Sequence, residues 1–394
     1  MRILYTSASV DIREEGLGGK THFVEVAKNL KELGNSLLVL ISGYRPKNRE
    51  NFGLNIKYIY IPPLHKRSLS YVWAEIFRFF YLTFYILKFH PEVIYARKDK
   101  WGFSPPILSF IFGVAYVAEV NGLVEEELKR YSNYPAWIMW LVSLSERINY
   151  FFAKKIICVA SGIKRELIKR YKVREEKLVV ISNGADTNLF KPLDKRKCRK
   201  KLDFDENGFY LGFVGYFAPW QGLEILIEAA NLVKKQGNTE IKYLILGDGS
   251  GLKKDLKDKA EKYNLKKEIS FLGHIDYKGI VYYINSFDVC YLCRKGLPSG
   301  CYSPLKLYEY LACGRPVIAS RAEGVTAVIE EGGCGYLFNP ESASDLAGKI
   351  IQAYQERQYL TQLGANGRRL VEKKYSWKKT AERIMEVDRR LKVC

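Results

Sequence analysis

The stretch that decides the fold spans residues 299–320 and reads SGCYSPLKLYEYLACGRPVIAS. Ser303 is typical of a helix N-cap and Pro304 of a first helical residue, so we expect a helix to begin at Pro304. Gly314 predicts the end of that helix, because glycine accepts the left-handed conformation that terminates helices. The apolar run 316–320 follows at once and predicts a buried strand. A helix that leads directly into a buried strand is a repeating unit of α/β proteins.

The same alternation of apolar runs and helical patterns extends outward over nearly the whole chain. Candidate strands lie at residues 2–7, 36–42, 56–61, 93–96, 115–120 and 156–160, and again at 210–215, 243–247, 269–273, 288–292 and 316–320. Because these runs are apolar on both faces, parallel sheets covered by helices are expected. The fold class is therefore α/β, with two doubly wound Rossmann-like domains whose strand carboxyl ends face each other across a cleft.

A basic segment at residues 195–201 separates the two sets of strands. We expect domains at 1–190 and 191–375, with a last helix at 376–394 that packs back on the first domain. The basic segment itself predicts a solvated linker helix, with a phosphate- or membrane-facing role as the alternative. At 394 residues and 47% hydrophobic composition, each domain can bury its own core, which excludes disorder as the main state.

The charge balance narrows the class of partner. Lys and Arg number 63 against 43 Asp and Glu, a formal net charge of +20, which points to nucleic acid, an anionic membrane or phosphate-bearing substrates. The excess is divided evenly between the halves and forms no recognition-helix stripe, so no nucleic-acid partner is expected. Eight scattered cysteines in mostly apolar runs, with no signal peptide before the first strand, indicate a reducing, cytoplasmic compartment.

Two short motifs have the composition of an anion-binding site. Lys306 and Glu309 share a face near the start of the helix in 299–320, where an ammonium, free amides and a carboxylate suit a diphosphate and a ribose. A structural ion pair is the alternative reading. Gly18 and Gly19 lie in a glycine turn that matches neither a dinucleotide fingerprint nor a P-loop, so a tight connection is equally open there. His22, at the same turn, is expected to be satisfied by backbone groups.

Six ordered motifs resemble those of retaining GT-B glycosyltransferases of family 4, and the resemblance covers nearly the whole chain. They are Gly18-Gly19, Ser182-Asn183-Gly184-Ala185-Asp186, Phe213-Val214-Gly215 with Trp220-Gln221-Gly222-Leu223, Leu246-Gly247-Asp248-Gly249, Phe271-Leu272-Gly273 and the window 299–320. The resemblance implies an enzyme that transfers a hexose from a nucleotide diphosphate sugar, UDP-linked first and GDP-linked second, to a hydroxyl with retention of configuration. It implies neither a metal nor a cofactor.

The resemblance also implies roles for individual residues. Lys306, Glu309 and Asn121 would be catalytic, with Glu309 on the donor ribose and Lys306 on its diphosphate. The other implied donor-binding residues are Gly18, Gly19, Tyr216, Gln221, Gly247, Gly249, Leu252, His274, Ile275, Cys301, Tyr302, Ser303 and Leu305. The acceptor side would hold Arg97, Glu119, Asn121 and Asn183, in a pattern similar to that of transferases that build polysaccharides and lipid-linked glycans.

This chain departs from the family pattern at three places. Cys301 stands where the first glutamate of the paired acidic motif is usual, so the donor sugar would be held by backbone, Tyr302 or Ser303. The usual phosphate-clamping cations fall on Tyr216 and Gln221, which implies that Lys306 supplies a relocated cation. Glu119-Val120-Asn121-Gly122 replaces the common acceptor-loop histidine. Arg97 and Glu119 are as well explained by a buried salt bridge across strand ends as by direct substrate contact.

Other functions remain as alternatives. A nucleotide-sugar epimerase of the same fold would turn over the donor without an acceptor, and a non-catalytic membrane- or nucleic-acid-associated protein would bind no nucleotide sugar. Cys290 and Cys293 have metal-ligand spacing, but no second pair or suitably spaced histidine accompanies them, so no metal site is expected.

The segment 69–89 is unusually aromatic but is interrupted by charges, which disfavours a membrane span. Helical spacing separates a stripe that we interpret as a core face from a stripe of cations and tyrosines suited to a lipid headgroup boundary. The first holds Leu69, Trp73, Ile76, Phe80, Thr83 and Leu87, and the second holds Arg67, Tyr71, Ala74, Arg78, Tyr81, Tyr85 and Lys88. With the apolar run 137–142, this predicts peripheral binding to an anionic cytoplasmic leaflet. A helix covered by loops is the alternative.

Overall fold

The computed structural model describes residues 1–7, 18–42, 52–61, 67–98, 102–131, 134–249, 251–296, 301 and 303–390. The described chain forms two compact units. The first contains the residues up to Ser182 together with the chain from Lys378, and the second contains Asn183–Trp377. The change of unit therefore falls eight residues before the expected boundary at 190, and helix α15 (Trp377–Arg390) lies almost wholly in the first unit.

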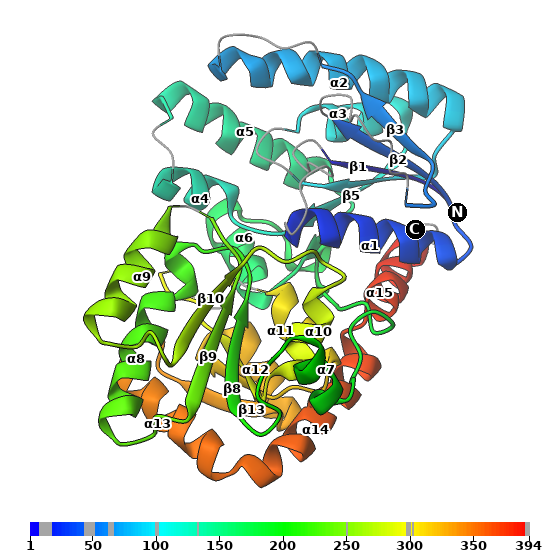
Figure 1. Cartoon of the computed structure of the whole chain (residues 1–394). Coiled ribbons are helices and arrows are strands. Elements are labelled where there is room, and N and C mark those ends of the chain that lie inside the picture. The colour runs from blue at the N-terminus through cyan, green and yellow to red at the C-terminus, as the bar shows by residue number, and fades with distance from the viewer. Residues whose placement is uncertain are drawn as a thin grey trace. The chain divides into compact units, whose positions relative to one another are not determined.

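A parallel sheet forms the centre of the first unit (Figure 1). Its strand order is β3-β2-β1-β4-β5-β6-β7. The strands are β1 (Arg2–Ser7), β2 (Ser36–Ser42), β3 (Ile56–Ile59), β4 (Val93–Arg97), β5 (Ala115–Val120), β6 (Lys155–Cys158) and β7 (Leu178–Val180). The central strands are almost fully buried, as expected for a sheet with helices on both faces.

Helices cover both faces of this first sheet. They are α1 (Gly18–Glu32), α2 (Arg67–Phe89), α3 (Ser104–Phe112), α4 (Val124–Tyr131), α5 (Ala136–Phe152) and α6 (Ser161–Tyr171), with the short helix η1 (Glu175–Lys177). Figure 1 shows α2, α3 and α5 on the face opposite α1, and α3 contacts both α2 and α5. These three helices form one layer, named here the α2/α3/α5 layer.

The second unit has a sheet of order β10-β9-β8-β11-β12-β13, also parallel throughout. Its strands are β8 (Phe209–Val214), β9 (Ile241–Leu246), β10 (Ile269–Gly273), β11 (Val289–Leu292), β12 (Val317–Ser320) and β13 (Gly335–Phe338). Its helices are α7 (Lys195–Lys201), η2 (Pro219–Gln221), α8 (Leu223–Lys235), α9 (Leu252–Lys262), α10 (Ile280–Ser286), α11 (Leu305–Ala312), α12 (Glu323–Gly332), α13 (Ala343–Gln355), η3 (Arg357–Tyr359) and α14 (Leu360–Lys374).

Each sheet has one edge strand that the sequence analysis did not predict. These are β7, of three residues, and β13, of four. Both pair with a neighbour on one side only, and β13 is mostly half-buried. Each has a short apolar run, at residues 178–181 and 336–338, so a signal was present that the sequence analysis overlooked.

The helix of the deciding window begins one residue later than expected. Helix α11 starts at Leu305, and Pro304 has the extended backbone of a residue that precedes a helix. The prediction of Ser303 as the N-cap is wrong. Its hydroxyl accepts the backbone N–H of Asn183 at 3.2 Å and lies 3.1 Å from the hydroxyl of Tyr308. Because the hydroxyl is engaged with Asn183 and Tyr308, it does not cap the helix.

The basic segment forms the expected helix, but it is not simply solvated. Asp194 caps α7 by accepting the N–H of Lys197. Arg199 is buried, donates to the carboxylate of Asp288 at 2.6 Å and lies over the ring of Tyr210. One cation of the run therefore anchors the helix to the second unit through a buried ion pair.

Helix α2 presents a different face to the core than the sequence predicts. Its buried row is Arg78, Leu82 and Ile86, while Ile76, Phe80 and Leu87 of the expected core stripe are exposed. Arg78 forms an ion pair of 3.2 Å with Glu75, so it is not a headgroup ligand. The side chains of Arg67 and Tyr71 lie outside the described residues. The helix is apolar almost all round, so the spacing of its apolar residues could not identify the buried face.

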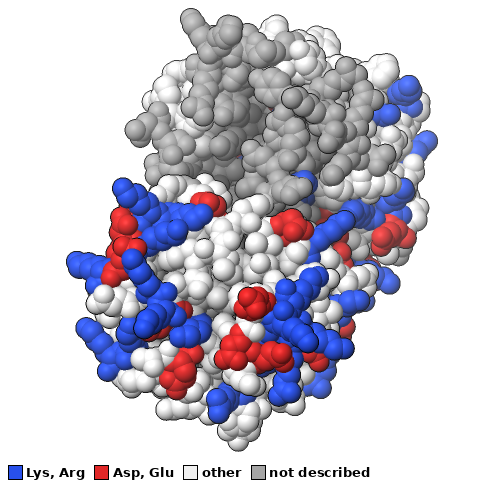
Figure 2. Space-filling model, viewed as in Figure 1, with Lys and Arg blue, Asp and Glu red and all other residues white. Residues whose placement is uncertain are grey.

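Cysteines and charges complete the description. The structure describes seven cysteines, all of them buried and none of them in a disulfide, and Cys394 lies outside the described residues. Among the described residues, none of the helices combines the length and apolar character needed to cross a bilayer. In Figure 2, Lys and Arg side chains over the second unit alternate with Asp and Glu. The positive charge on this face is therefore distributed among carboxylates.

Candidate active site

In the second unit, the loops after β8, β9 and β10 are joined by backbone hydrogen bonds. Gly215 N–H donates to the carbonyl of Leu246 at 3.0 Å, and Gly247 N–H donates to that of Gly273 at 2.7 Å. These loops follow the carboxyl ends of three adjacent parallel strands, where ligands bind in doubly wound sheets. The predicted Gly247 turn therefore lies at the edge where a ligand site is expected.

The glycines of these loops are required by close packing. Gly249 has a φ of +126°, and a Cβ there would lie 2.1 Å from the ring of Tyr216. Gly215 has a φ of +149°, and a Cβ there would lie 2.6 Å from Nζ of Lys306. Backbone and cation thus approach one another more closely than any residue with a side chain would permit.

Lys306 lies in the first turn of α11 and reaches the end of β8. Its ammonium donates to Oε1 of Gln221 at 3.0 Å and lies 4.2 Å from the centre of the Phe213 ring. Gln221, one of the predicted donor residues, therefore orients the ammonium of Lys306. Burial lowers the pKa of Lys306 to about 7, because a low-dielectric setting disfavours the charged form.

Glu309 lies one turn further along α11. Its Oε1 accepts the hydroxyl of Tyr277 at 3.1 Å, and burial raises the pKa of Glu309 to about 7. Lys306 and Glu309 therefore both change protonation near neutrality. Perturbed titratable groups of this kind concentrate at functional sites. An arriving anion would favour the protonated ammonium, and ribose hydroxyls would favour the ionised carboxylate.

Arg294 is a second cation at this site that the sequence analysis missed. It follows β11 and lies over the indole ring of Trp220 at 5.4 Å. Its charge contributes to the lowered pKa of Lys306, after burial. The available signal was its position directly after a buried strand, at the carboxyl edge of the sheet. The charge of Arg294 therefore acts on Lys306 in the same part of the second unit.

The remaining predicted donor residues are placed as follows. Cys301 is buried, Leu305 opens α11, and Tyr302 lies outside the described residues. Leu252 opens α9 and packs partly against the core, while His274 and Ile275 follow β10. Asn183, predicted on the acceptor side, belongs to the second unit, and its side chain donates to the carbonyl of Ser303 at 2.6 Å. This hydrogen bond holds the loop that precedes α11.

In the first unit, Glu119 is the centre of a buried polar cluster. His22 Nε2 lies 2.6 Å from its Oε1, and Tyr95 and Asn121 donate to the same carboxylate. Burial alone would raise the pKa of Glu119, but His22 and the two hydrogen bonds outweigh it and lower the value to about 2. The sequence analysis expected backbone partners for His22 and did not foresee this contact with a carboxylate at the end of β5.

Arg97 lies at the end of β4, beside Glu119 in the register of the two strands. The carboxylate of Glu119 contacts His22, Tyr95 and Asn121, and a bridge between Arg97 and Glu119 stays a prediction. The guanidinium of Arg97 faces the glycine turn, since a Cβ on Gly19 would lie 3.5 Å from its Nη2. Gly18 and Gly19 open helix α1.

The described residues hold no cluster of three or more His, Cys, Asp or Glu side chains arranged to bind a metal ion. Cys290 and Cys293 are instead buried in and after β11. Burial raises the pKa of the Cys293 thiol, which keeps it protonated as a packing group.

Family models match both units. The model described as Glycosyltransferase Family 4 matches residues 17–189, and that described as Glycosyl transferases group 1 matches residues 194–370. An uncharacterized glycosyltransferase of Methanocaldococcus jannaschii is 23% identical over 393 residues, with 95% of each chain covered.

Solved structures share the fold along the whole chain. The sucrose-phosphate synthase of Thermosynechococcus elongatus superposes with a TM-score of 0.81 at 18% identity, covering 100% of both chains. The Anabaena protein HepE, in complex with UDP and glucose, has a TM-score of 0.76 at 20% identity and covers 98% of this chain and 99% of its own. The two family models and the two parallel-sheet units show that the chain belongs to the group 1 glycosyltransferases of the GT-B fold.

Proposed function

We propose that the chain transfers a hexose from a nucleotide diphosphate sugar, UDP-linked in the first place, to a hydroxyl with retention of configuration. The observation that carries the proposal is the pairing of Lys306 and Glu309 at the start of α11, with both pKa values near 7. HepE, which has the same fold, is described in complexes with UDP and with UDP-glucose. In this proposal the second unit holds the donor and the first unit holds the acceptor.

The chemical step moves charge onto the leaving diphosphate. The bond from the anomeric carbon to the diphosphate oxygen breaks, and the acceptor oxygen bonds to that carbon on the same face. The acceptor proton passes to the leaving phosphate. Lys306, Arg294 and the first amides of α11 would stabilise the developing negative charge, as fixed cations and helix N-termini do. Because the chain supplies these cations itself, we expect activity to persist in the presence of a chelator.

The ends of β4 and β5 are the proposed acceptor site. Asn121 is held by the buried carboxylate of Glu119, which leaves its amide oxygen to orient an acceptor hydroxyl. Arg97 is the cation at this strand end and would contact a charged group of the acceptor. We infer that Glu119 is a positioning residue here, since its carboxylate is already occupied by three side chains. A glycan or a lipid-linked glycan fits this polar arrangement.

We further propose that the enzyme works in the cytoplasm at the inner face of the membrane and contributes to polysaccharide assembly. Support comes from the apolar side chains that the α2/α3/α5 layer exposes, among them Phe80 and Trp140. A membrane-bound acceptor would explain why an enzyme of the glycosyltransferase class carries such a surface.

A thermal-shift screen tests the donor assignment. Uridine, guanosine and adenosine diphosphates and their sugars would each be added to the full chain. A ligand at about 100 times its Kd raises the free energy of unfolding by about 2.7 kcal/mol, which shifts the melting midpoint. We expect the uridine series to shift it most, and NMR of the product to show retained anomeric configuration. Absence of any shift, or donor turnover unchanged without an acceptor, would contradict the proposal.

A further inference from the structure

Exposed apolar side chains are concentrated on one layer of the first unit. Of the thirteen large apolar side chains that the described residues expose, nine lie on the α2/α3/α5 layer. They are Ile76, Phe80, Phe84 and Leu87 on α2, Phe110 and Ile111 on α3, and Trp137, Trp140 and Phe151 on α5. Apolar residues gathered in this way mark an interaction surface, whereas single exposed ones do not.

Within the layer, the exposed residues follow helical stripes. Those of α2 recur at intervals of four, four and three residues, so they share one face. On α5, Trp137, Trp140 and Phe151 fall on one face together with the exposed Arg147. A helix with apolar and aromatic residues beside a cation is the composition of interfacial helices.

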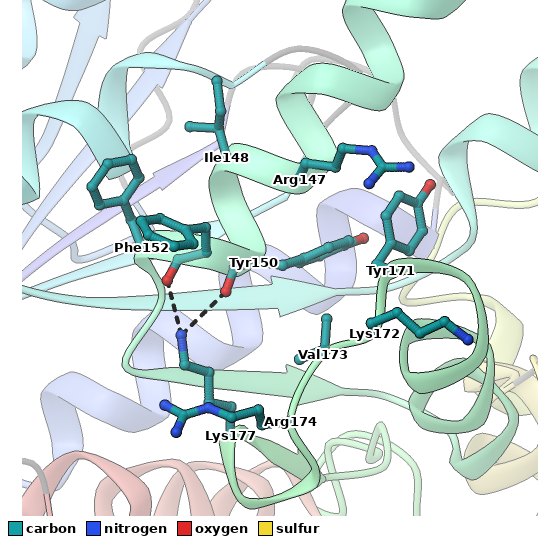
Figure 3. A pocket seen from close by; sticks show the side chains of 10 residues that line it. Arg147, Ile148, Tyr150, Phe152, Tyr171, Lys172, Val173, Arg174 and Lys177 are labelled. Atoms are coloured by element: carbon teal, nitrogen blue, oxygen red, sulfur yellow. Dashed lines mark hydrogen bonds between the residues drawn. The ribbon is translucent and has the colours of Figure 1, made fainter.

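A basic pocket opens at the carboxyl end of α5. It has a volume of about 730 Å³ and is lined by Arg147, Ile148, Tyr150, Phe151, Phe152, Tyr171, Lys172, Val173, Arg174 and Lys177 (Figure 3). The described lining thus includes four cations and neither Asp nor Glu. Arg174 has a carboxylate partner, Glu176, at 3.2 Å. Arg147 lies over the ring of Tyr171, and no ion pair of Arg147 or Lys172 is found among the described residues.

One cation of this pocket, Lys177, is held in place by backbone carbonyls. Lys177 Nζ donates to the carbonyl of Phe151 at 2.8 Å and to that of Tyr150 at 3.4 Å, as the dashed lines in Figure 3 show. Burial and then the charge of Arg174 lower the pKa of Lys177. The pocket therefore carries an excess of positive charge that an anion would relieve.

The pocket and the apolar layer meet at a phenylalanine cluster. Phe151 and Phe152 line the pocket, and the ring of Phe152 lies 5.1 Å from that of Phe151 and 5.3 Å from that of Phe110. The side chains of Phe151 and Phe110 are 75% and 70% exposed. An anion in the pocket would therefore be flanked by protruding aromatic rings.

Topology separates this pocket from the proposed acceptor site. Helix α5 leads into the amino end of β6 at Lys155, and η1 leads into the amino end of β7 at Leu178. Arg97 and Glu119 lie at the carboxyl ends of β4 and β5, the opposite edge of the same parallel sheet. The pocket is thus a second site of the first unit.

We propose that the α2/α3/α5 layer docks on a lipid bilayer and that the basic pocket binds the phosphate of an anionic headgroup. The proposal rests on the membrane location proposed above and identifies the surface responsible. Aromatic rings such as Phe110 and Phe151 would enter the headgroup region, where apolar burial and cation attraction add. A second copy fits less well, because a twofold contact would bring the same cations face to face.

Flotation of the full chain with vesicles tests the proposal. Vesicles of phosphatidylcholine alone are compared with phosphatidylcholine mixed with phosphatidylglycerol, at low and high salt. We expect binding to the anionic vesicles that weakens with salt. Each cation near an anionic surface contributes about 1 kcal/mol, so Arg147→Gln with Lys172→Gln should weaken partitioning about 30-fold. Phe110→Ser with Phe151→Ser should also weaken it.

Matched variants on the second unit control for charge and hydrophobicity. Lys254→Gln with Lys257→Gln removes two exposed cations of α9, and Tyr359→Ser removes an exposed aromatic. Neither should change flotation. Equal binding to both vesicle types, or flotation unaffected by the pocket variants, would overturn the proposal. So would binding of inorganic phosphate without vesicles, or a dimer that the phenylalanine variants dissociate. The shift of the melting midpoint by nucleotides is measured on the same variants. It shows whether the donor site is intact, so loss of membrane binding can be told apart from loss of donor binding.

Discussion

The ammonium of Lys306 occupies the space that a side chain on Gly215 would need, since a Cβ there would lie 2.6 Å from Nζ. One residue is at the end of β8 and the other at the start of α11. The close approach joins the glycine turn to the cation proposed to bind the donor diphosphate. The absence of a side chain at Gly215 therefore positions a charge 91 residues further along the chain.

Replacing Gly215 by Ala should displace Lys306 and lower kcat/KM by roughly tenfold or more, because a small misplacement of a charged group weakens transition-state stabilisation. The change also strains the backbone at positive φ. Gly237→Ala is the control: its φ is +85°, but no atom lies within 4 Å of the added Cβ. Both variants should lose stability in urea, by about 1 kcal/mol from the strain, but only Gly215→Ala should lose activity. Equal activity in the two would contradict the steric argument.

Removing the cation itself should have a larger effect. Lys306→Ala should lower kcat/KM by roughly 100-fold, the scale of losing one donor to a transition-state charge. Lys253→Ala is the matched control, because Lys253 forms a surface pair with Asp248 in the same group of loops. Steady-state kinetics with a uridine-linked donor provide the measurement. An activity of Lys306→Ala within about threefold of wild type would contradict the proposal that Lys306 stabilises the charge of the donor diphosphate.

Glu309 and Lys306 predict opposite pH dependences on either side of neutrality. The pKa of Glu309 is raised from 4.5 to about 7, so its contribution to stability is complete below pH 4.5 and is lost as pH rises through about 7. The pKa of Lys306 is lowered from 10.5 to about 7, so its contribution to stability is complete above pH 10.5 and is lost as pH falls to about 7. Unfolding in urea across pH should therefore show the wild type losing stability relative to Glu309→Gln from about pH 4.5 to 7. A flat difference would mean that Glu309 is not perturbed.

The ribose role of Glu309 requires a separate comparison. Glu309→Ala should weaken binding of the nucleoside diphosphate, and Glu309→Gln should weaken it less, because an amide oxygen still accepts one hydroxyl bond. Isothermal titration with uridine diphosphate and with pyrophosphate distinguishes the two parts of the ligand. Only the nucleotide should respond to Glu309, so an equal loss with pyrophosphate would argue against a ribose contact.

Breaking the pair of His22 and Glu119 should destabilise the first unit. Leaving a buried carboxylate without one of its polar partners costs about 1 to 3 kcal/mol, so His22→Ala should lower the free energy of unfolding by that order. Glu119→Gln alone completes the cycle, and the double variant His22→Ala with Glu119→Gln should lose less than the sum of the two single variants, since no carboxylate is then left without its partner. Lys28→Ala removes the surface partner of Glu25 and should cost less than about 1 kcal/mol. Denaturant unfolding at neutral pH measures all four variants, and an additive double variant would refute the coupling.

The predicted donor residues show which parts of the candidate site can be predicted from local sequence spacing and which cannot. Lys306 and Glu309 are three residues apart on one helix, so a local pattern was enough to place them together. Arg294 comes from the end of another strand and was missed, because the sheet order β8-β11-β12 brings it there and no local spacing encodes that order. The pairing of His22 with Glu119 joins α1 to β5 for the same reason.

Helix α2 is a case in which the element was predicted correctly but its buried face was not. Its length and apolar character could be predicted, but two of its faces are apolar enough to form a core, and the sequence analysis chose the wrong one. The side that is buried depends on what α3 and the sheet present to it, including Ser104, whose hydroxyl and N–H donate to Glu75. Tertiary packing therefore reversed the assignment of Arg78 from a surface cation to a buried ion-pair member.

The sequence by itself determined the features that depend on short-range periodicity and turn chemistry: two doubly wound α/β units, the glycine turns and the cation and carboxylate of α11. Only the tertiary structure decided which helix face is exposed, which strand ends are neighbours and which cations share a pocket. The physical reason is that burial and electrostatic pairing depend on residues far apart in the chain, as in the pocket formed where α5 ends beside η1.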